Sequence, residues 1–264
     1  MTTDVRTVPV WQGQIHMRVR SKGRGPAVVF LHGPWGPTWD PFLDELSRTF
    51  SVHAPEHPGT SPGRPDDAYA LDGFWDLVLC YDELLAGLGL SRAAFVGHSF
   101  GAMVACEIAA ACPYQVERLV LIDALGLWRD DAPIPNWMLL PHADLPGRVF
   151  RDANSEAAQH MFAAPEDPDA RVMARVGLQW AMGATGKFLW PIPDKGLKKR
   201  IHRVAAPTLV VWGQEDRIVP PVYAQEFARR IDGARVETIE RAGHAPHLEQ
   251  PTAVARLVRD FLSG

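Results

Sequence analysis

The residues best suited to chemistry form the run GHSFG at positions 97–101, with Ser99 at its centre. An apolar, strand-like run at 93–96 precedes it, and a helical pattern over 100–111 follows. A serine on so sharp a strand-to-helix turn projects its hydroxyl clear of the sheet, and the glycines leave room for the turn. The helix N-terminus favours negative charge beside it. The run therefore predicts Ser99 as a nucleophile, with the backbone N–H of Phe100 as a donor to an oxyanion.

A serine hydroxyl needs a base to take its proton, and a histidine near the C-terminus meets that need. His244 follows a strand-like run at 236–240, so it is expected in a loop at the edge of a sheet. His247 competes for this role, but the glycine at Gly243 favours His244. Two histidines three residues apart also occur in metal sites, but Pro246 lies between them and no third ligand is evident. We expect no metal.

Asp216 is the predicted acid that orients His244 and stabilises its imidazolium form. It follows the apolar run at 209–212, whose carboxyl end would lie at the same edge of a parallel sheet. Asp123 follows a similar run at 119–122 and remains the alternative acid.

The elements that must position these residues alternate between strand-like and helical patterns. Near-continuous apolar runs suit strands of a parallel sheet that is buried on both faces. These runs are 27–31, 93–96, 119–122 and 209–212, and the helical patterns are 72–88, 100–111, 223–230 and 252–262. Residues 6–11 and 15–19 have the pattern of an antiparallel pair at the start. The sequence predicts an α/β fold with a doubly wound, mostly parallel sheet.

Residues 124–206 interrupt this alternation, because they contain no convincing core strand and are too long for an irregular loop. Helical patterns at 156–162 and 170–181 predict a helical cap inserted after the sixth strand. The core would then comprise 1–123 and 207–264. The cap holds four of the nine tryptophans, and we expect some to line an apolar pocket. The candidates for substrate binding are Trp128, Trp137, Trp180 and Trp190, with Trp137 and Trp180 favoured.

These motifs resemble those of the α/β-hydrolase family over essentially the whole chain. Members carry a His-Gly turn after the third strand, a proline and glycine after the fourth, a cap after the sixth, an acid after the seventh and a late histidine. The matching segments here are His32-Gly33, 54–61, 124–206, 213–220 and 243–251. The resemblance implies a capped serine hydrolase with the chain order serine, acid, histidine. Some members place the acid after the sixth strand instead, at the position of Asp123.

The sequence departs from this pattern at one position of the predicted oxyanion site. The second oxyanion donor in the family is commonly the backbone N–H just after His-Gly. That residue is Pro34 here, which has no N–H, so the N–H of Trp35 is the next candidate. Two other histidines are expected to have no catalytic role: His98 packs the turn, and His57, after the fourth strand, lies at the surface.

Composition excludes several partners. The net charge is −4 and no strongly basic segment occurs, so we expect no nucleic-acid binding. No stretch approaches the roughly 18 apolar residues of a membrane helix, and the N-terminus lacks a signal peptide. Three cysteines suggest free thiols in a reducing compartment, so a cytoplasmic location is expected. Residues 183–187 have the wrong spacing for a phosphate-binding loop, and no cofactor is implied.

The expected activity is hydrolysis of an ester or related acyl bond of a small, largely apolar molecule by a monomer or homodimer. The same triad also suits a carbon–carbon bond hydrolase of the diketone or meta-cleavage-product type. A third hypothesis, from another class, is a hydrolase-like ligand receptor that signals through movement of the cap.

Overall fold

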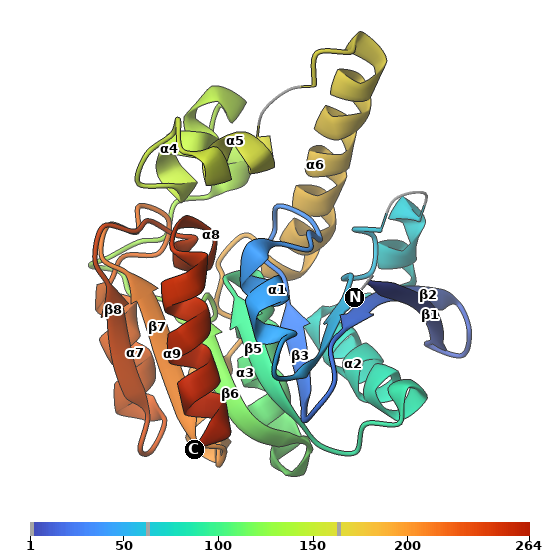
Figure 1. Cartoon of the computed structure of the whole chain (residues 1–264), viewed down its shortest axis with the longest axis vertical. Helices are drawn as coiled ribbons and strands as arrows, with labels where there is room; N and C mark the ends of the chain where they lie inside the picture. The colour runs from blue at the N-terminus through green and yellow to red at the C-terminus, as the bar shows by residue number, and fades with distance from the viewer. Residues whose placement is uncertain (1–2, 62–63, 163–164) are drawn as a thin grey trace.

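The apolar runs predicted as strands form the centre of a twisted sheet. The computed structural model describes residues 3–61, 64–162 and 165–264, and their sheet has eight strands in the order β1-β2-β4-β3-β5-β6-β7-β8 (Figure 1). β2 runs antiparallel to both of its neighbours, β1 and β4. The strands β4, β3, β5, β6, β7 and β8 run parallel to one another. The strands are β1 (Asp4–Val10), β2 (Ile15–Lys22), β3 (Ala27–Leu31), β4 (Ser51–Pro55), β5 (Ala93–His98), β6 (Val116–Ile122), β7 (Thr208–Gly213) and β8 (Arg235–Ile239). The predicted doubly wound, mostly parallel sheet is confirmed.

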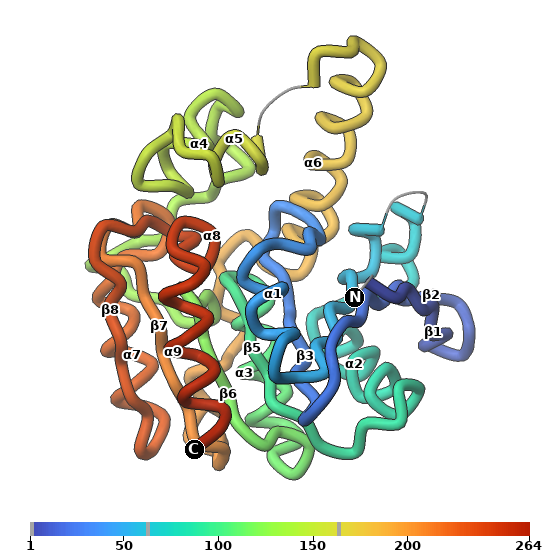
Figure 2. The backbone as a smooth tube through the Cα atoms, viewed as in Figure 1, coloured from blue at the N-terminus to red at the C-terminus, as the bar shows by residue number. Residues whose placement is uncertain are grey.

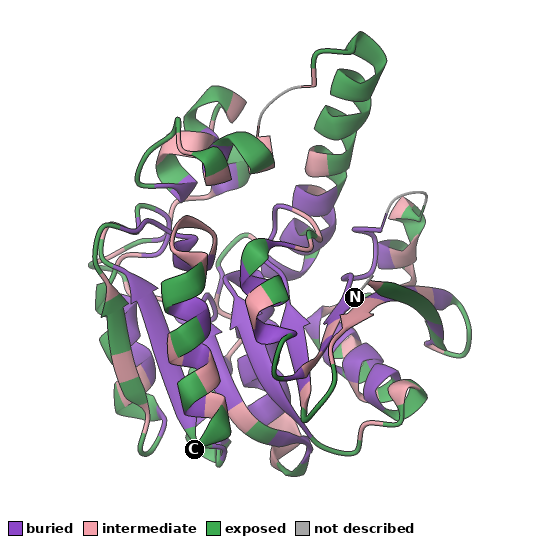
Figure 3. Cartoon of the chain, viewed as in Figure 1, coloured by how far each residue is buried: buried purple, intermediate pink, exposed green. Residues whose placement is uncertain are grey.

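Helices cover both faces of this sheet, because successive side chains of a strand point to opposite sides. In β5, Phe95 packs into the core beneath α2, α3 and α7, whereas Ala94 and Val96 pack into the core beneath α1 and α9. The α-helices are α1 (Pro41–Leu46), α2 (Phe74–Leu88), α3 (Phe100–Ala111), α4 (Leu145–Val149), α5 (Glu156–Phe162), α6 (Pro168–Leu189), α7 (Val222–Arg230), α8 (Pro246–Glu249) and α9 (Pro251–Ser263). The 3₁₀ segments are Pro65–Ala70, Pro113–Gln115, Trp137–Leu139, His142–Asp144, Leu197–Lys199 and Ile201–Arg203. Strands β5 and β7 are buried along their whole length (Figure 3).

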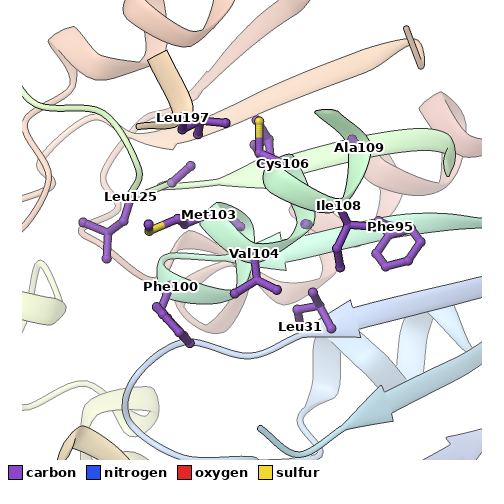
Figure 4. Packing of buried hydrophobic residues seen from close by; sticks show 14 of the residues in the cluster. Leu31, Phe95, Phe100, Met103, Val104, Cys106, Ile108, Ala109, Leu125 and Leu197 are labelled. Atoms are coloured by element: carbon purple, nitrogen blue, oxygen red, sulfur yellow. The ribbon is translucent and has the colours of Figure 1, made fainter. Parts of the chain in front are cut away.

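Helix α3 is the most deeply buried helix and carries the predicted nucleophile at its start. Phe100 and Val104 pack toward β3, while Met103 and Cys106 lie on the side of Leu197 (Figure 4). Every residue from Phe100 to Ala110 is buried. Because the helix is enclosed on all sides, its N-terminus is held rigidly against the end of β5.

Residues 124–206 contain helices α4, α5 and α6 and, in the part that the structure describes, no strand. The division into a core and a cap remains a prediction. The chain returns to the sheet edge in α4 and α5, and α6 projects away from the body (Figure 2). The first half of α6 is exposed, and its second half, from Ala181, is largely buried (Figure 3). Among the described helices none has the length and apolar character needed to cross a bilayer.

Candidate active site

Ser99 occupies the turn between β5 and α3 in a backbone conformation that non-glycine residues rarely adopt, with φ 54° and ψ −114°. The flanking glycines are required by close packing. A Cβ atom at Gly97 would lie 2.5 Å from Cα of Ala102, and one at Gly101 would lie 2.1 Å from the carbonyl oxygen of Leu31. The turn therefore holds the Ser99 side chain in one direction, at the carboxyl end of the strands.

The three residues predicted as a catalytic triad are joined by hydrogen bonds. Oγ of Ser99 lies 2.9 Å from Nε2 of His244, and Nδ1 of His244 lies 2.8 Å from Oδ2 of Asp216. A carboxylate only accepts, so Nδ1–H donates to Asp216 and leaves Nε2 free to accept the serine proton. Ser99 and His244 have no exposed surface, and Asp216 is 6% exposed. The arrangement can activate the hydroxyl group as a nucleophile.

Backbone and side-chain contacts fix the acid and the base. Oδ1 of Asp216 accepts hydrogen bonds from the N–H groups of Ile218 and Val219, at 2.8 and 2.9 Å. His244 donates its own backbone N–H to the carbonyl oxygen of Val149, at 2.7 Å. These contacts leave the imidazole ring little freedom to turn.

His98 has a contact that the sequence did not reveal. Its Nε2–H donates to the carbonyl oxygen of His244 at 2.7 Å, so the residue before the nucleophile also holds the loop of the base. Burial lowers the pKa of His98 well below its usual value, which keeps the ring neutral. Only the folded chain reveals this role, because His98 and His244 lie 146 positions apart in the sequence.

The competing histidine, His247, packs among other rings. It is buried with its ring near those of Phe30 and Phe42, at 6.1 and 5.6 Å between ring centroids. Burial lowers its pKa to about 3. His247 therefore packs as a neutral core residue.

The alternative acid, Asp123, lies at the end of β6 beside the triad. Its Oδ1 accepts the backbone N–H of Gly213 at 2.9 Å, and the residue is fully buried. The Nδ1–H group of His244 donates its hydrogen bond to Asp216. One ligand-type atom each of Asp123, Asp216 and His244 lies within 4.8 Å of the others. The two acids therefore form one cluster beneath the imidazole.

The two predicted oxyanion donors belong to the start of α3 and to the loop after β3. Phe100 begins α3, where a backbone N–H has no acceptor within the helix. The loop after β3 comes close to Ser99: a Cβ atom on Gly33 would lie 3.5 Å from Cβ of Ser99. Since Pro34 has no N–H, the N–H of Trp35 is the next one along that loop. The assignment of both donors remains a prediction.

A buried network of neutral side chains supports this loop. Nδ1–H of His32 donates to the carbonyl oxygen of Gly33 at 2.7 Å, and Nε2–H of His57 donates to that of His32 at 2.9 Å. The Tyr81 hydroxyl donates to Nδ1 of His57 at 2.5 Å. Burial lowers the pKa of His57 to about 4. The expected surface position of His57 was wrong: it is 1% exposed, because Tyr81 and His32 satisfy its polar atoms inside the protein.

Aromatic side chains from the 124–206 segment meet Trp35. The centroid of Trp35 lies 5.8 Å from those of Trp137 and Phe162, and Trp137 lies 4.9 Å from Trp190. We refer to Trp35, Trp137, Phe162 and Trp190 as the aromatic cluster. Trp137 is fully buried, and Trp35 is 7% exposed. Of the four predicted substrate-binding tryptophans, Trp137 thus contacts Trp35 of the loop after β3, and Trp190 packs against Trp137.

The other two predicted tryptophans lie elsewhere. Trp180 is 40% exposed on α6, where it borders a surface hollow with Val172 and Val176. Trp128 is half-buried, and its Nε1–H donates to Asp130 at 2.8 Å. Neither ring takes part in the stacking contacts of the aromatic cluster.

A cavity of about 480 Å³ lies between α5 and the loops that begin α1 and α9. Its wall includes Arg151, His160 and the buried carboxyl group of Asp40. Glu249, also in the wall, accepts the backbone N–H of Gly243 at 2.6 Å. The cavity therefore adjoins the loop that carries His244.

The chain is similar in sequence and in structure to several known proteins. Residues 28–257 match the family described as "Alpha/beta hydrolase family". The chain is 28% identical over 250 residues to pimeloyl-acyl-carrier-protein methyl ester esterase of Neisseria meningitidis, covering 90% of this chain and 93% of that one. It is 26% identical over 279 residues to 2-hydroxy-6-oxo-2,4-heptadienoate hydrolase of Pseudomonas putida, covering 96% and 95%. The structure of 2-hydroxy-6-oxo-6-phenylhexa-2,4-dienoate hydrolase from Rhodococcus sp. strain RHA1 superposes with a TM-score of 0.78 at 21% identity, over all of both chains.

Proposed function

Since the chain belongs to the alpha/beta hydrolase family, we propose that it is a serine hydrolase that cleaves an ester or related acyl bond of a small, largely apolar substrate. Ser99 is the nucleophile, His244 the base and Asp216 the acid that orients it. The observation that carries the proposal is the hydrogen-bonded line from Ser99 through His244 to Asp216, with distances of 2.9 and 2.8 Å. Its two contacts have the tautomer and direction that proton transfer from serine needs.

The reaction follows from this arrangement in two halves. Oγ of Ser99 attacks the acyl carbon while Nε2 of His244 takes the serine proton, and the N–H groups of Phe100 and Trp35 stabilise the oxyanion. The imidazolium gives that proton to the leaving alcohol, and an acyl-enzyme remains on Ser99. Water then donates a proton to His244 and attacks the acyl-enzyme. The imidazolium gives this proton to Oγ of Ser99 as the acid is released, which restores the serine.

The preference for an apolar substrate rests on the aromatic cluster. Trp35, from the loop after β3, and Trp137, from the 124–206 segment, are almost completely buried against each other. Because Ser99 and His244 have no exposed surface, substrate entry requires these rings or their segment to move. The 124–206 segment acts as a cap whose aromatic side chains set substrate size.

Carbon–carbon bond cleavage is the second candidate. The likeness in sequence to the heptadienoate hydrolase of Pseudomonas putida supports it. This reaction uses the same three residues, so the difference between the two functions lies in how the pocket recognises the substrate.

The cellular setting is part of the proposal. The three cysteines, Cys80, Cys106 and Cys112, are free. Burial raises the pKa of Cys80 to about 12, so its thiol is unreactive at neutral pH. Free thiols support a cytoplasmic location. The proposal also includes a monomer or homodimer that acts on a small molecule without a cofactor.

The experiment that tests the proposal is a series of p-nitrophenyl esters of increasing acyl length, run beside a panel of 2-hydroxy-6-oxodienoates and β-diketones. Multiple turnovers with kcat/KM at least tenfold higher for the best ester support an esterase. The reverse ratio supports the carbon–carbon hydrolase. A single slow turnover with every substrate contradicts both and favours a ligand receptor.

A further inference from the structure

The buried acid beside the triad, Asp123, has an unusual setting. It follows β6 with a φ of 45°, and its carboxyl group is fully enclosed. Oδ1 accepts the N–H of Gly213 at 2.9 Å. Oδ2 is buried and meets no hydrogen-bond donor among the described residues. A buried carboxylate oxygen without a donor is costly, whereas a protonated oxygen can donate.

Asp216 offers the acceptor for such a proton. Atoms of Asp123, Asp216 and His244 lie within 4.8 Å of one another. Two carboxyl groups this close in a buried site do not both ionise. Asp216 accepts three hydrogen bonds, from the N–H groups of Ile218 and Val219 and from Nδ1 of His244. Asp123 accepts one. The negative charge is therefore more stable on Asp216, and the proton belongs on Asp123.

We propose that Asp123 is protonated at neutral pH and donates a hydrogen bond from its carboxyl group to the Asp216 carboxylate, as a positioning residue for the acid of the triad. The proposal rests on the proposed function, since it assigns Asp216 as that acid. Asp123 thus fixes the orientation of Asp216 without adding a second negative charge beneath His244.

The charged groups around Asp123 also favour its protonated form. Burial, the charge of Asp216 and the hydrogen bond to it raise the pKa of Asp123 well above its usual value. The titratable groups that face Asp123 are Asp216 from the loop after β7, and His244 and Glu249 from the segment around α8. The charge of Glu249 raises the pKa of Asp123 further.

The activity test compares Asp123→Asn with Asp123→Ala. An asparagine amide donates to Asp216 and its oxygen accepts from Gly213, so Asp123→Asn should rescue the function, with kcat within about threefold of wild type. Asp123→Ala removes a hydrogen bond to a charged group, and kcat should fall by about 10- to 100-fold with little change in KM. The acidic limb of the kcat/KM profile should keep its midpoint in Asp123→Asn. A midpoint lowered by one pH unit or more would show that Asp123 is ionised, and wild-type kcat in Asp123→Ala would show that it positions nothing.

A spectroscopic test separates this inference from the proposed function, because it needs no turnover. At pH 7 the wild-type infrared spectrum should contain the carbonyl band of a protonated carboxylic acid, which deuteration shifts and Asp123→Asn removes. Asp40→Asn is the control for the other buried carboxyl group whose raised pKa contributes near pH 7. Loss of a band in Asp123→Asn supports protonation even where no ester is cleaved or Asp123→Ala fails to fold. An unchanged spectrum in Asp123→Asn overturns the inference.

Discussion

Replacing Trp137 with phenylalanine tests whether the aromatic cluster selects substrates by size. Trp137 is fully buried, and its Nε1 has no hydrogen-bond partner among the described residues, so the phenyl ring removes volume without removing a hydrogen bond. Truncation to alanine would cost about 3–5 kcal/mol of stability, and phenylalanine should cost less. One methylene in an apolar pocket is worth about 1–3 kcal/mol, or about 10- to 200-fold in kcat/KM. We therefore expect the ratio of kcat/KM for long and short esters to rise at least about tenfold.

The assay is kcat/KM for p-nitrophenyl acetate, butyrate, hexanoate and octanoate, measured with the melting temperature of each variant. Trp180→Phe is the matched control, because that ring is 40% exposed on the outer side of α6. It should leave the chain-length preference unchanged. The reasoning fails if Trp137→Phe scales all four esters by one factor, or if Trp180→Phe changes the preference as strongly.

Three further substitutions probe the triad and its supports. Asp216→Asn should lower kcat by roughly 10⁴-fold, because a neutral amide cannot stabilise the imidazolium. A loss smaller than that of Asp123→Asn would assign the acid of the triad to Asp123, after β6. Burial raises the pKa of Asp40 from 3.8 to about 7. Because the unfolded chain loses this proton more readily than the folded chain, the free energy of unfolding falls as pH rises from about 4 to about 7. The amide oxygen in Asp40→Asn can still accept the N–H of Leu43. In urea unfolding, the free energy of unfolding of Asp40→Asn minus that of wild type should be higher at pH 8 than at pH 4, by up to about 4 kcal/mol. The same difference at both pH values would contradict this. Arg200 makes two hydrogen bonds, of 2.9 and 2.6 Å, to the fully buried Glu107 of α3, so Arg200→Ala should cost about 3–5 kcal/mol in the same assay, and a cost below about 1 kcal/mol would show that the pair is not needed.

The elements that carry the site were predictable because their signals are local. A continuous apolar run such as 209–212 indicates a strand buried on both faces, and it lies within β7. The residue types of the turn at 97–101, at their fixed spacing, indicate a nucleophilic serine. By contrast, α1 (Pro41–Leu46) gave no helical pattern, since six residues span fewer than two turns and its stability comes from packing against α9.

The features that were missed depend on contacts between distant residues. His57 is buried because Tyr81, 24 positions away, donates to it. Trp137 and Trp180 look equivalent in the sequence, yet one is enclosed by Trp35 and Trp190 while the other faces outward from a projecting helix. Composition reports how many aromatic side chains a segment holds, but only tertiary packing decides which of them are buried.

Labelling with a fluorophosphonate probe, read by peptide mass, tests the central claim most directly. The probe should attach to Ser99 alone, since Ser99 is the hydroxyl group within 2.9 Å of Nε2 of His244. Ser99→Ala should abolish labelling, lower kcat for the best ester by roughly 10⁴-fold or more and leave the melting temperature within a few degrees of wild type. Label on another residue, or wild-type turnover by Ser99→Ala, would contradict the account.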